Sequence, residues 1–320
     1  MIRSFDLRDI TLVAQIEQQG TPLNAELALT RHPQPLQSAL SGMFSLRGRA
    51  LRTYILRADG QTGLLQLRQR TNAKQGVILY MVPDLKNDPQ AADLWTELLD
   101  HAARQAGQLG IQHLVAEAPE DSPAIEVLQR AGYAIYLRQD ILQLVRTRLT
   151  ISADPIMRLC ESHDEWGVQQ LYTNIAPRLV QQAEGLPQLH RTGSVRGYVL
   201  EDQMEIVAYL EVRRGPDGAW FNLLIHPRAE ARASQIIQFG LSLFGSNWNA
   251  PISCGVRRYQ EWLRRPLESL GFESFGSSVI MVKHLVKSLY DAELDLARAH
   301  VLVEGRAKVA AQMVEPKGTA

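Results

Sequence analysis

One stretch, residues 219–244, constrains the fold of this chain more than any other. Its first part, up to Ile225, is a short apolar run after the turn Gly215-Pro216-Asp217-Gly218, which predicts a buried strand. Pro227 ends this strand because proline cannot donate to a sheet. From Glu230 onward, apolar residues recur three or four apart and predict a helix. A strand that leads directly into a helix presents main-chain N–H groups suited to an anion such as pyrophosphate.

Length and composition narrow the class of protein. The chain has 320 residues, a length typical of about two domains, and its 45% hydrophobic content allows well-filled cores. No apolar run approaches the roughly 18 residues of a membrane helix, and MIRSFDLRDI lacks a signal-peptide core, so we expect a cytoplasmic protein without a membrane partner. Basic and acidic residues balance at 34 each, which favours no nucleic-acid partner. The cysteines, Cys160 and Cys254, form no zinc set, and we expect no metal site.

The first 150 residues predict a definite order of strands and helices. Asp9 is expected to cap a helix that ends near Gln18, and Pro83 to end a strand before the best-patterned helix of the chain. Residues 21–50, with three prolines and a helical-looking LQSALSGMF, are placed only loosely. The predicted elements are, in order, a strand over 2–5, a helix over 9–18, strands over 51–57, 62–68 and 76–82, a helix over 89–106, a strand over 112–116, a short helix over 122–132 and a strand over 134–145.

The second half repeats this order with little sequence identity. Pro83 and Pro227 stand 49 and 44 residues before the pairs Gly132-Tyr133 and Gly271-Phe272. The repeat consists of strands over 157–159, 195–200, 206–212, 219–225, 252–256 and 277–286, with helices from Asp164, from Glu230 and through Trp262. We therefore predict two tandem domains, 1–150 and 151–286, divided near 152–155. A helical tail with a disordered end, 287–320, would dock on the second domain or bind a partner.

Ile225-His226-Pro227, followed by an arginine-containing loop and a helix, resembles the acyl-CoA loop of the Gcn5-related N-acetyltransferase (GNAT) superfamily. The family pattern is Val-x-Pro-x-x-Arg-Gly-x-Gly-x-Gly/Ala. The order of elements and the Gly-aromatic pair before the last strand are also typical of that family. Here Glu230 takes the position of the family's arginine, and Ala231, Ala233 and Gln235 take glycine or alanine positions. The resemblance implies an α/β fold with a mixed sheet, present twice, and an acyl-CoA-dependent N-acyltransferase.

The resemblance places acetyl-CoA or another acyl-CoA in the second domain. The residues that would bind it are Ile225, Arg228, Ala231, Arg232, Ala233 and Ser234. Alanine in place of glycine keeps the N–H group wherever φ stays negative. The first domain is less suited to an anion, because Asp84 and Asp88 add negative charge and Pro89 lacks an N–H group, which Lys86 and Asn87 offset only in part. Solvent-exposed arginines without a ligand remain an equal alternative for the second loop.

The usual proton-transfer residues of the family are missing from both copies. Leu128 and Leu267 stand where a tyrosine acid is often found. Tyr259 is the candidate proton donor and His226 the candidate base, with a packing aromatic and an exposed imidazole as the plain alternatives. The acceptor is expected to be a small-molecule or peptide amine. The competing hypothesis is a catalytically degenerate pair that binds acyl-CoA or a partner protein, because fold alone does not determine activity.

Overall fold

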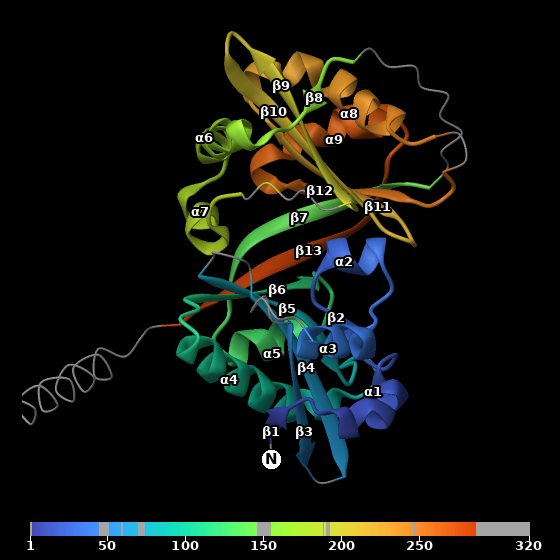
Figure 1. Ribbon diagram of the computed structural model, residues 1–320, viewed down its shortest axis with the longest axis vertical. Helices are drawn as coiled ribbons and strands as arrows, with labels where there is room; N and C mark the ends of the chain where they lie inside the picture. Colours follow the sequence, from blue (N-terminus) through green and yellow to red (C-terminus); the bar gives the residue numbers. More distant parts are fainter. Residues whose placement is uncertain are drawn as a thin grey trace, which may run out of the picture. The chain divides into compact units, whose positions relative to one another are not determined.

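The computed structural model describes residues 2–44, 51–58, 60–69, 74–145, 155–187, 189, 193–245 and 248–285 (Figure 1). Most of the predicted division, residues 152–154, lies outside this range, as do the last residue of the predicted final strand, 286, and the predicted tail, 287–320. No helix within it is long and apolar enough to cross a bilayer. The predicted order of strands and helices is confirmed in both halves, and the molecule has the predicted α/β fold with a mixed sheet.

The elements alternate along the chain as follows. The first half contains β1 (Ile2–Ser4), η1 (Leu7–Asp9), α1 (Ile10–Ile16), β2 (Thr21–Pro22), α2 (Ala25–Thr30), α3 (Pro35–Phe44), β3 (Leu51–Ala58), β4 (Gln61–Gln69), β5 (Gln75–Val82), η2 (Pro89–Ala91), α4 (Ala92–Gln108), β6 (His113–Pro119), α5 (Ala124–Arg130) and β7 (Ala134–Leu144). The second half contains β8 (Arg158–Leu159), η3 (Ser162–Asp164), α6 (Glu165–Ile175), α7 (Arg178–Glu184), β9 (Val195–Asp202), β10 (Glu205–Arg214), β11 (Ala219–Ile225), η4 (Pro227–Arg232), α8 (Ala233–Ser242), β12 (Ile252–Arg257), η5 (Arg258–Leu263), α9 (Arg264–Ser269) and β13 (Glu273–His284).

A single 13-stranded sheet runs through both halves. Its order is β1-β3-β4-β5-β6-β13-β7-β12-β11-β10-β9-β8, and β2 pairs with β5. The last strand of each half lies beside a strand of the other half. β13 places Ile280 opposite Glu117 of β6, and β7 places Leu142 opposite Cys254 of β12. The two halves therefore exchange their last strands, and residues 1–284 form one compact unit.

The two halves begin with the same arrangement of an arginine and a buried aspartate. In the first half, both guanidinium nitrogens of Arg3 donate to Asp9, at 2.6 and 2.5 Å, and the Asp6 N–H donates to the same carboxylate at 3.0 Å. In the second half, Arg158 donates to Asp164 at 2.7 and 2.8 Å, and the Glu161 N–H donates at 2.7 Å. Each aspartate is buried at the point where a 3-10 turn becomes a helix.

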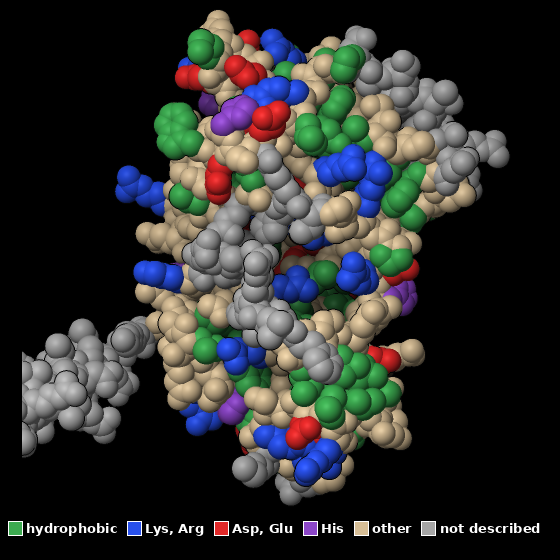
Figure 2. All heavy atoms as spheres, viewed as in Figure 1, with side chains coloured by type: hydrophobic (Ala, Val, Ile, Leu, Met, Phe, Trp, Pro, Cys, Tyr) green, Lys and Arg blue, Asp and Glu red, His purple; other side chains and the backbone are tan. Residues whose placement is uncertain are grey.

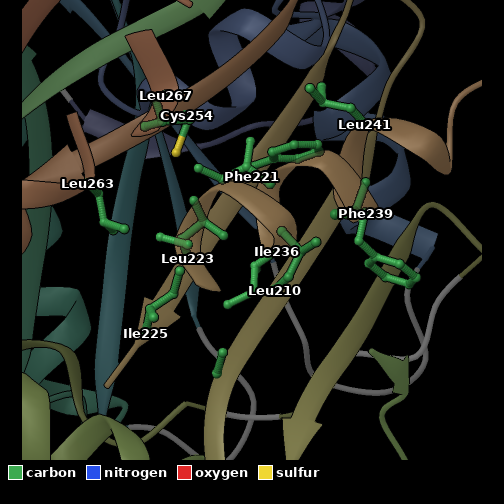
Figure 3. Packing of buried hydrophobic residues seen from close by; sticks show 14 of the residues in the cluster. Leu210, Phe221, Leu223, Ile225, Ile236, Phe239, Leu241, Cys254, Leu263 and Leu267 are labelled. Carbon is green, nitrogen blue, oxygen red and sulfur yellow. The ribbon is translucent and has the colours of Figure 1, made fainter. Parts of the chain in front are cut away.

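Each half has a filled core on both faces of its strands. In the second half, α8 and α9 cover one face and α6 and α7 the other (Figure 1). On the α8 face, Figure 3 shows Leu223 and Ile225 of β11 gathered with Ile236 of α8 and Cys254 of β12. On the α6 face, Leu171 packs with Tyr209 of β10. β11 is apolar and buried along most of its length, as a central strand covered on both faces requires.

Candidate functional site

In the second half, two parallel strands separate part-way along their length. β11 and β12 pair at three positions, the last joining Phe221 to Cys254. Beyond that point β11 stays paired with β10 as far as Ile225, whereas β12 stays paired with β7 as far as Arg257. The strands therefore open into a gap that leads to the loop at η4. The first half has the same feature, because β5 and β6 pair only as far as Val77 and Val115.

In the second half, a side chain bonds the edge of β11 that faces the gap. Gln260 of η5 is 2% exposed and its amide lies against the open edge of β11. In the orientation that satisfies both of its polar groups, the amide donates to the Leu223 carbonyl at 3.2 Å and accepts from the Ile225 N–H at 3.2 Å. These are the two bonds that a neighbouring strand would make.

In the first half, the gap is filled by main chain. The Leu23 N–H donates to the Leu79 carbonyl of β5 at 2.9 Å, and the Leu23 carbonyl accepts from the Glu117 N–H of β6 at 3.0 Å. Leu23 is fully buried and follows β2, whose residues Thr21 and Pro22 pair with β5. A short piece of the chain thus occupies the space between the two strands.

The loop after β11 satisfies several of its own N–H groups. The His226 ring accepts the Arg228 N–H at its Nδ1 atom, at 3.2 Å, and the Ala229 N–H donates to the His226 carbonyl at 2.8 Å. A 3-10 helix, η4, then precedes α8, so the amino end of α8 adjoins another helix rather than open loop. Fewer N–H groups face solvent here than the sequence suggests. While Nδ1 accepts this bond, the neutral ring carries its proton on Nε2, so His226 can act as a base only after releasing its cap.

The two arginines predicted to bind phosphate are both near carboxylates of the β9–β10 hairpin. Arg228 lies 3.6 Å from Glu205, and Arg232 lies 3.8 Å from Asp202. All four side chains are substantially exposed, so each pair contributes little to stability and can be displaced by a stronger anion. Arg158 makes a third contact of this kind, 3.1 Å from Glu201.

Two of the predicted cofactor residues, Ser234 and Arg228, line two different grooves. Ser234 lines a groove of about 710 Å³ between η4 and α9, together with Arg264 and Arg265, while Glu230 and Glu261 add negative charge. Arg264 donates to Asp140 of β7 and to Glu268, both at 2.8 Å. Of the other predicted residues, Ala231 is exposed, whereas Ile225 and Ala233 are buried and can offer only main-chain groups.

His226 and Arg228 instead line a groove of about 560 Å³ beside α6. Its other walls come from α6 and from the β9–β10 hairpin, with exposed Trp166 and Met204 at its rim. Figure 2 shows basic, acidic and histidine side chains mixed on this end of the molecule. Arg228 thus shares a groove with His226, whereas Ser234 lines the other groove.

Tyr259 lies in a polar cluster on the α7 face. Its hydroxyl accepts from Arg257 Nη1 at 3.0 Å, and the same nitrogen donates to Glu184 at 2.8 Å. Tyr136 donates to the other Glu184 oxygen at 3.1 Å. Burial raises the pKa of Tyr259, while the neighbouring Arg257 charge lowers it, so the phenol is protonated at neutral pH and keeps a hydrogen to donate. Tyr259 directly precedes Gln260 in the chain, and it does not line the groove that contains His226.

The sequence reasoning missed a carboxylate on the α6 face of the strands. Glu211 of β10 lies opposite Asn222 of β11, and its Oε1 accepts from Asn222 Nδ2 at 3.2 Å. Tyr209 donates to the other oxygen at 3.3 Å. Glu211 is 9% exposed, and the only signal in the sequence was an acidic residue inside the apolar run EIVAYLEVRR. Gln260 gave no signal, since a glutamine after a strand reads as ordinary surface.

Comparisons with known proteins identify the fold. No family model and no curated protein matches the sequence. Among solved structures, a tandem GNAT protein from the clavulanic acid biosynthesis pathway aligns with a TM-score of 0.56 and 16% identity, over 90% of this chain and 99% of that one. A GCN5-related N-acetyltransferase from Sphaerobacter thermophilus aligns with a TM-score of 0.54 and 12% identity, over 89% and 95%. The chain therefore has the GNAT fold, and it has that fold in tandem, as the resemblance implied.

Proposed function

We propose that this chain binds acyl-CoA in its second half and transfers the acyl group to an amine. The observation that supports this most is the gap between β11 and β12 beyond Phe221 and Cys254, which adjoins the η4 loop and the groove beside α9. An extended arm that carries amide groups fits such a gap, because the edge of β11 offers a carbonyl at Leu223 and an N–H at Ile225.

The second half is favoured over the first because of what fills each gap. One glutamine side chain must move to open the β11–β12 gap. Opening the β5–β6 gap requires Leu23 to leave, which breaks its main-chain hydrogen bonds to both strands. The first gap is therefore the harder one to open, and Asp84 and Asp88 make its loop less suited to phosphate.

The phosphate groups would contact the loop and the groove that follow the gap. Arg228 and Arg232 lie on the loop, and their exposed carboxylate partners compete only weakly with a phosphate. Ser234, Arg264 and Arg265 supply a hydroxyl and two guanidinium groups in the adjoining groove.

The transfer itself needs an amine to attack the thioester carbonyl and the sulfur to leave as a thiol. The amine loses a proton and the departing thiolate gains one. Tyr259 is positioned to donate a proton, because Arg257 holds its hydroxyl as an acceptor and leaves the hydrogen available. Proton removal from the amine falls to water or to Glu211, which lies on the α6 face of the strands beside Asn222. A small-molecule or peptide amine is the acceptor class that this scheme requires.

Calorimetry with acetyl-CoA tests the proposal and its placement. We expect Arg232→Glu to weaken binding about tenfold or more, because it replaces a phosphate-binding charge with a repelling one. Lys86→Glu, the matched charge reversal in the first half, should leave the affinity unchanged. Equal losses from both variants would contradict the placement in the second half. Thiol release measured across a panel of amines then tests for transfer.

The second candidate is a binding or interaction module that has lost acyl transfer. It is favoured by one specific observation, which is that groups of the protein itself fill both gaps, Gln260 in one and Leu23 in the other. Absence of any heat with acetyl-CoA and with CoA at high micromolar concentration would reject both the transferase and an acyl-CoA-binding module, and would leave a structural or protein-interaction role.

A further inference from the structure

Gln260 makes the contacts that an amide-bearing ligand would need. Its side-chain amide both donates to Leu223 and accepts from Ile225, at 3.2 Å each, on the edge of β11 that faces the gap. A primary amide is suited to this task because it presents a donor and an acceptor side by side, as a peptide group does. Gln260 is 2% exposed, so these bonds also satisfy two main-chain groups that would otherwise be buried without partners.

We propose that Gln260 is a gate in the second-half gap, which pairs with β11 in the unliganded protein and must leave before an acyl-CoA arm enters. This inference rests on the proposed function. The ligand's amide then takes over the bonds to Leu223 and Ile225, so opening the gate exchanges one amide for another. The exchange leaves no buried main-chain group unsatisfied, and its cost is the release of the glutamine side chain into another position.

The local backbone allows such a movement. η5 does not run as a regular helix, because Gln260 itself departs from helical geometry, with φ −126° and ψ 31°. Its neighbours on both sides are held in place. Leu263 is buried in the core beneath α8, and Tyr259 is bonded to Arg257. A change confined to Gln260 can therefore move its side chain while η5 keeps its anchors.

Tyr259 makes the gate relevant to the reaction as well as to binding. It adjoins Gln260 in the chain and presents a hydroxyl on the face opposite to the α8 core. When Gln260 leaves the gap, the space that opens lies beside the residue proposed to donate a proton. Entry of the arm and approach to the proton donor thus depend on the same side chain.

The test uses Gln260→Ala in the full chain, with acetyl-CoA as the probe. We expect the variant to bind acetyl-CoA roughly tenfold tighter than the wild type, because the ligand no longer displaces two hydrogen bonds. In the absence of ligand, the Ile225 amide hydrogen should exchange with solvent faster in the variant, since its acceptor is gone. Gln75→Ala is the matched control. Gln75 is also buried and donates to a main-chain carbonyl, that of Ala183, at 2.8 Å, but it lies at the start of β5.

The possible outcomes separate this inference from the proposed function. Tighter binding and faster Ile225 exchange in Gln260→Ala, with neither change in Gln75→Ala, support the gate. Equal affinities of Gln260→Ala and wild type overturn the gate and leave the proposed function standing. Binding by neither protein overturns both. If Gln260→Ala does not fold, Gln260→Asn serves in its place, because its shorter amide cannot span both main-chain partners, and the same outcomes apply.

Discussion

A buried aspartate fixes the start of each half at the residue scale. Asp9 and Asp164 each accept from an arginine six residues earlier and from a main-chain N–H three residues earlier. The hydrogen bonds from Arg158 lower the pKa of Asp164 to about 2, and those from Arg3 lower the pKa of Asp9. The lowered pKa means that the folded state favours the charged carboxylate over the protonated one.

Replacing Asp164 with asparagine should destabilise the protein at neutral pH by about 2 kcal/mol, because a charged acceptor of several hydrogen bonds is lost. The stabilisation from this carboxylate is complete above the unfolded pKa of about 4 and disappears as the pH falls towards 2. Urea unfolding of wild type and Asp164→Asn between pH 3 and pH 7 checks this. The difference between their unfolding free energies should shrink as the pH falls, and a constant difference would contradict the role assigned to Asp164. Asp9→Asn serves as the matched variant in the first half and should behave alike.

Single residues were also where sequence reasoning reached its limit. The periodicity of 219–244 correctly predicted a strand, a proline and a helix, because apolar spacing reports burial directly. It did not predict that His226 would cap the loop or that Gln260 would fill the gap, because both contacts depend on where the chain returns in space. The roles proposed for Tyr259 and for the loop arginines remain predictions.

At the scale of elements, α2 joins the two halves of the molecule. Its amino end is capped by Glu117 of β6, whose Oε2 accepts the Ala25 N–H at 2.9 Å. The other oxygen of Glu117 accepts from Gln139 of β7 at 2.7 Å and from Ser278 of β13 at 2.6 Å. Further along α2, Glu26 forms an ion pair with Arg213 of β10. One buried carboxylate thus holds a helix and both exchanged strands together.

Burial raises the pKa of Glu117, so the folded protein binds its proton more tightly than the unfolded chain does. The unfolding free energy should therefore fall as the pH rises from about 4.5 towards the raised pKa. Glu117→Gln cannot titrate and should lack this component of the pH dependence. The measurement is the unfolding free energy of both proteins between pH 4 and pH 8. Parallel curves over that range would contradict the prediction.

The elements that sequence reasoning missed share a physical cause. β2, α2 and α7 are short, from two to seven residues, and too brief to show a periodic pattern. Their positions come from tertiary contacts instead, such as the pairing of β2 with β5 or the bond from Gln75 to Ala183 of α7. Longer strands and helices, whose apolar residues repeat several times, were predicted to within a few residues.

At the scale of the whole molecule, the exchange of β7 and β13 makes the stability of each half depend on a strand of the other half. β7 alternates between buried and partly exposed side chains, whereas β13 has one continuous buried run, and neither pattern tells which half the strand completes. The structure shows that β13 pairs with β6 over seven positions, from Ser278 to His284. The order of the elements could be read from the sequence, but the exchange could not.

A chain that stops at Gly271 should therefore lose structure in its first half. Without β13, β6 has no partner on the side away from β5, and Glu117 loses its bond from Ser278. Amide hydrogen exchange of β5 and β6 should rise strongly in this truncated chain. A chain that stops at Leu285 retains all of β13 and is the control, with exchange expected to match that of the full chain. Unchanged protection of β6 in the shorter chain would show that the first half folds by itself.

The same exchange has a consequence for biosynthesis. A ribosome delivers β6 first, yet its neighbour β13 begins only at Glu273, long after β6 has ended at Pro119. The growing polypeptide must consequently keep one edge of β6 unpaired until β13 has been translated, and an unpaired strand edge of this kind is a site that chaperones bind. Removing either half would take away a strand that pairs with the other half, β7 beside β12 or β13 beside β6.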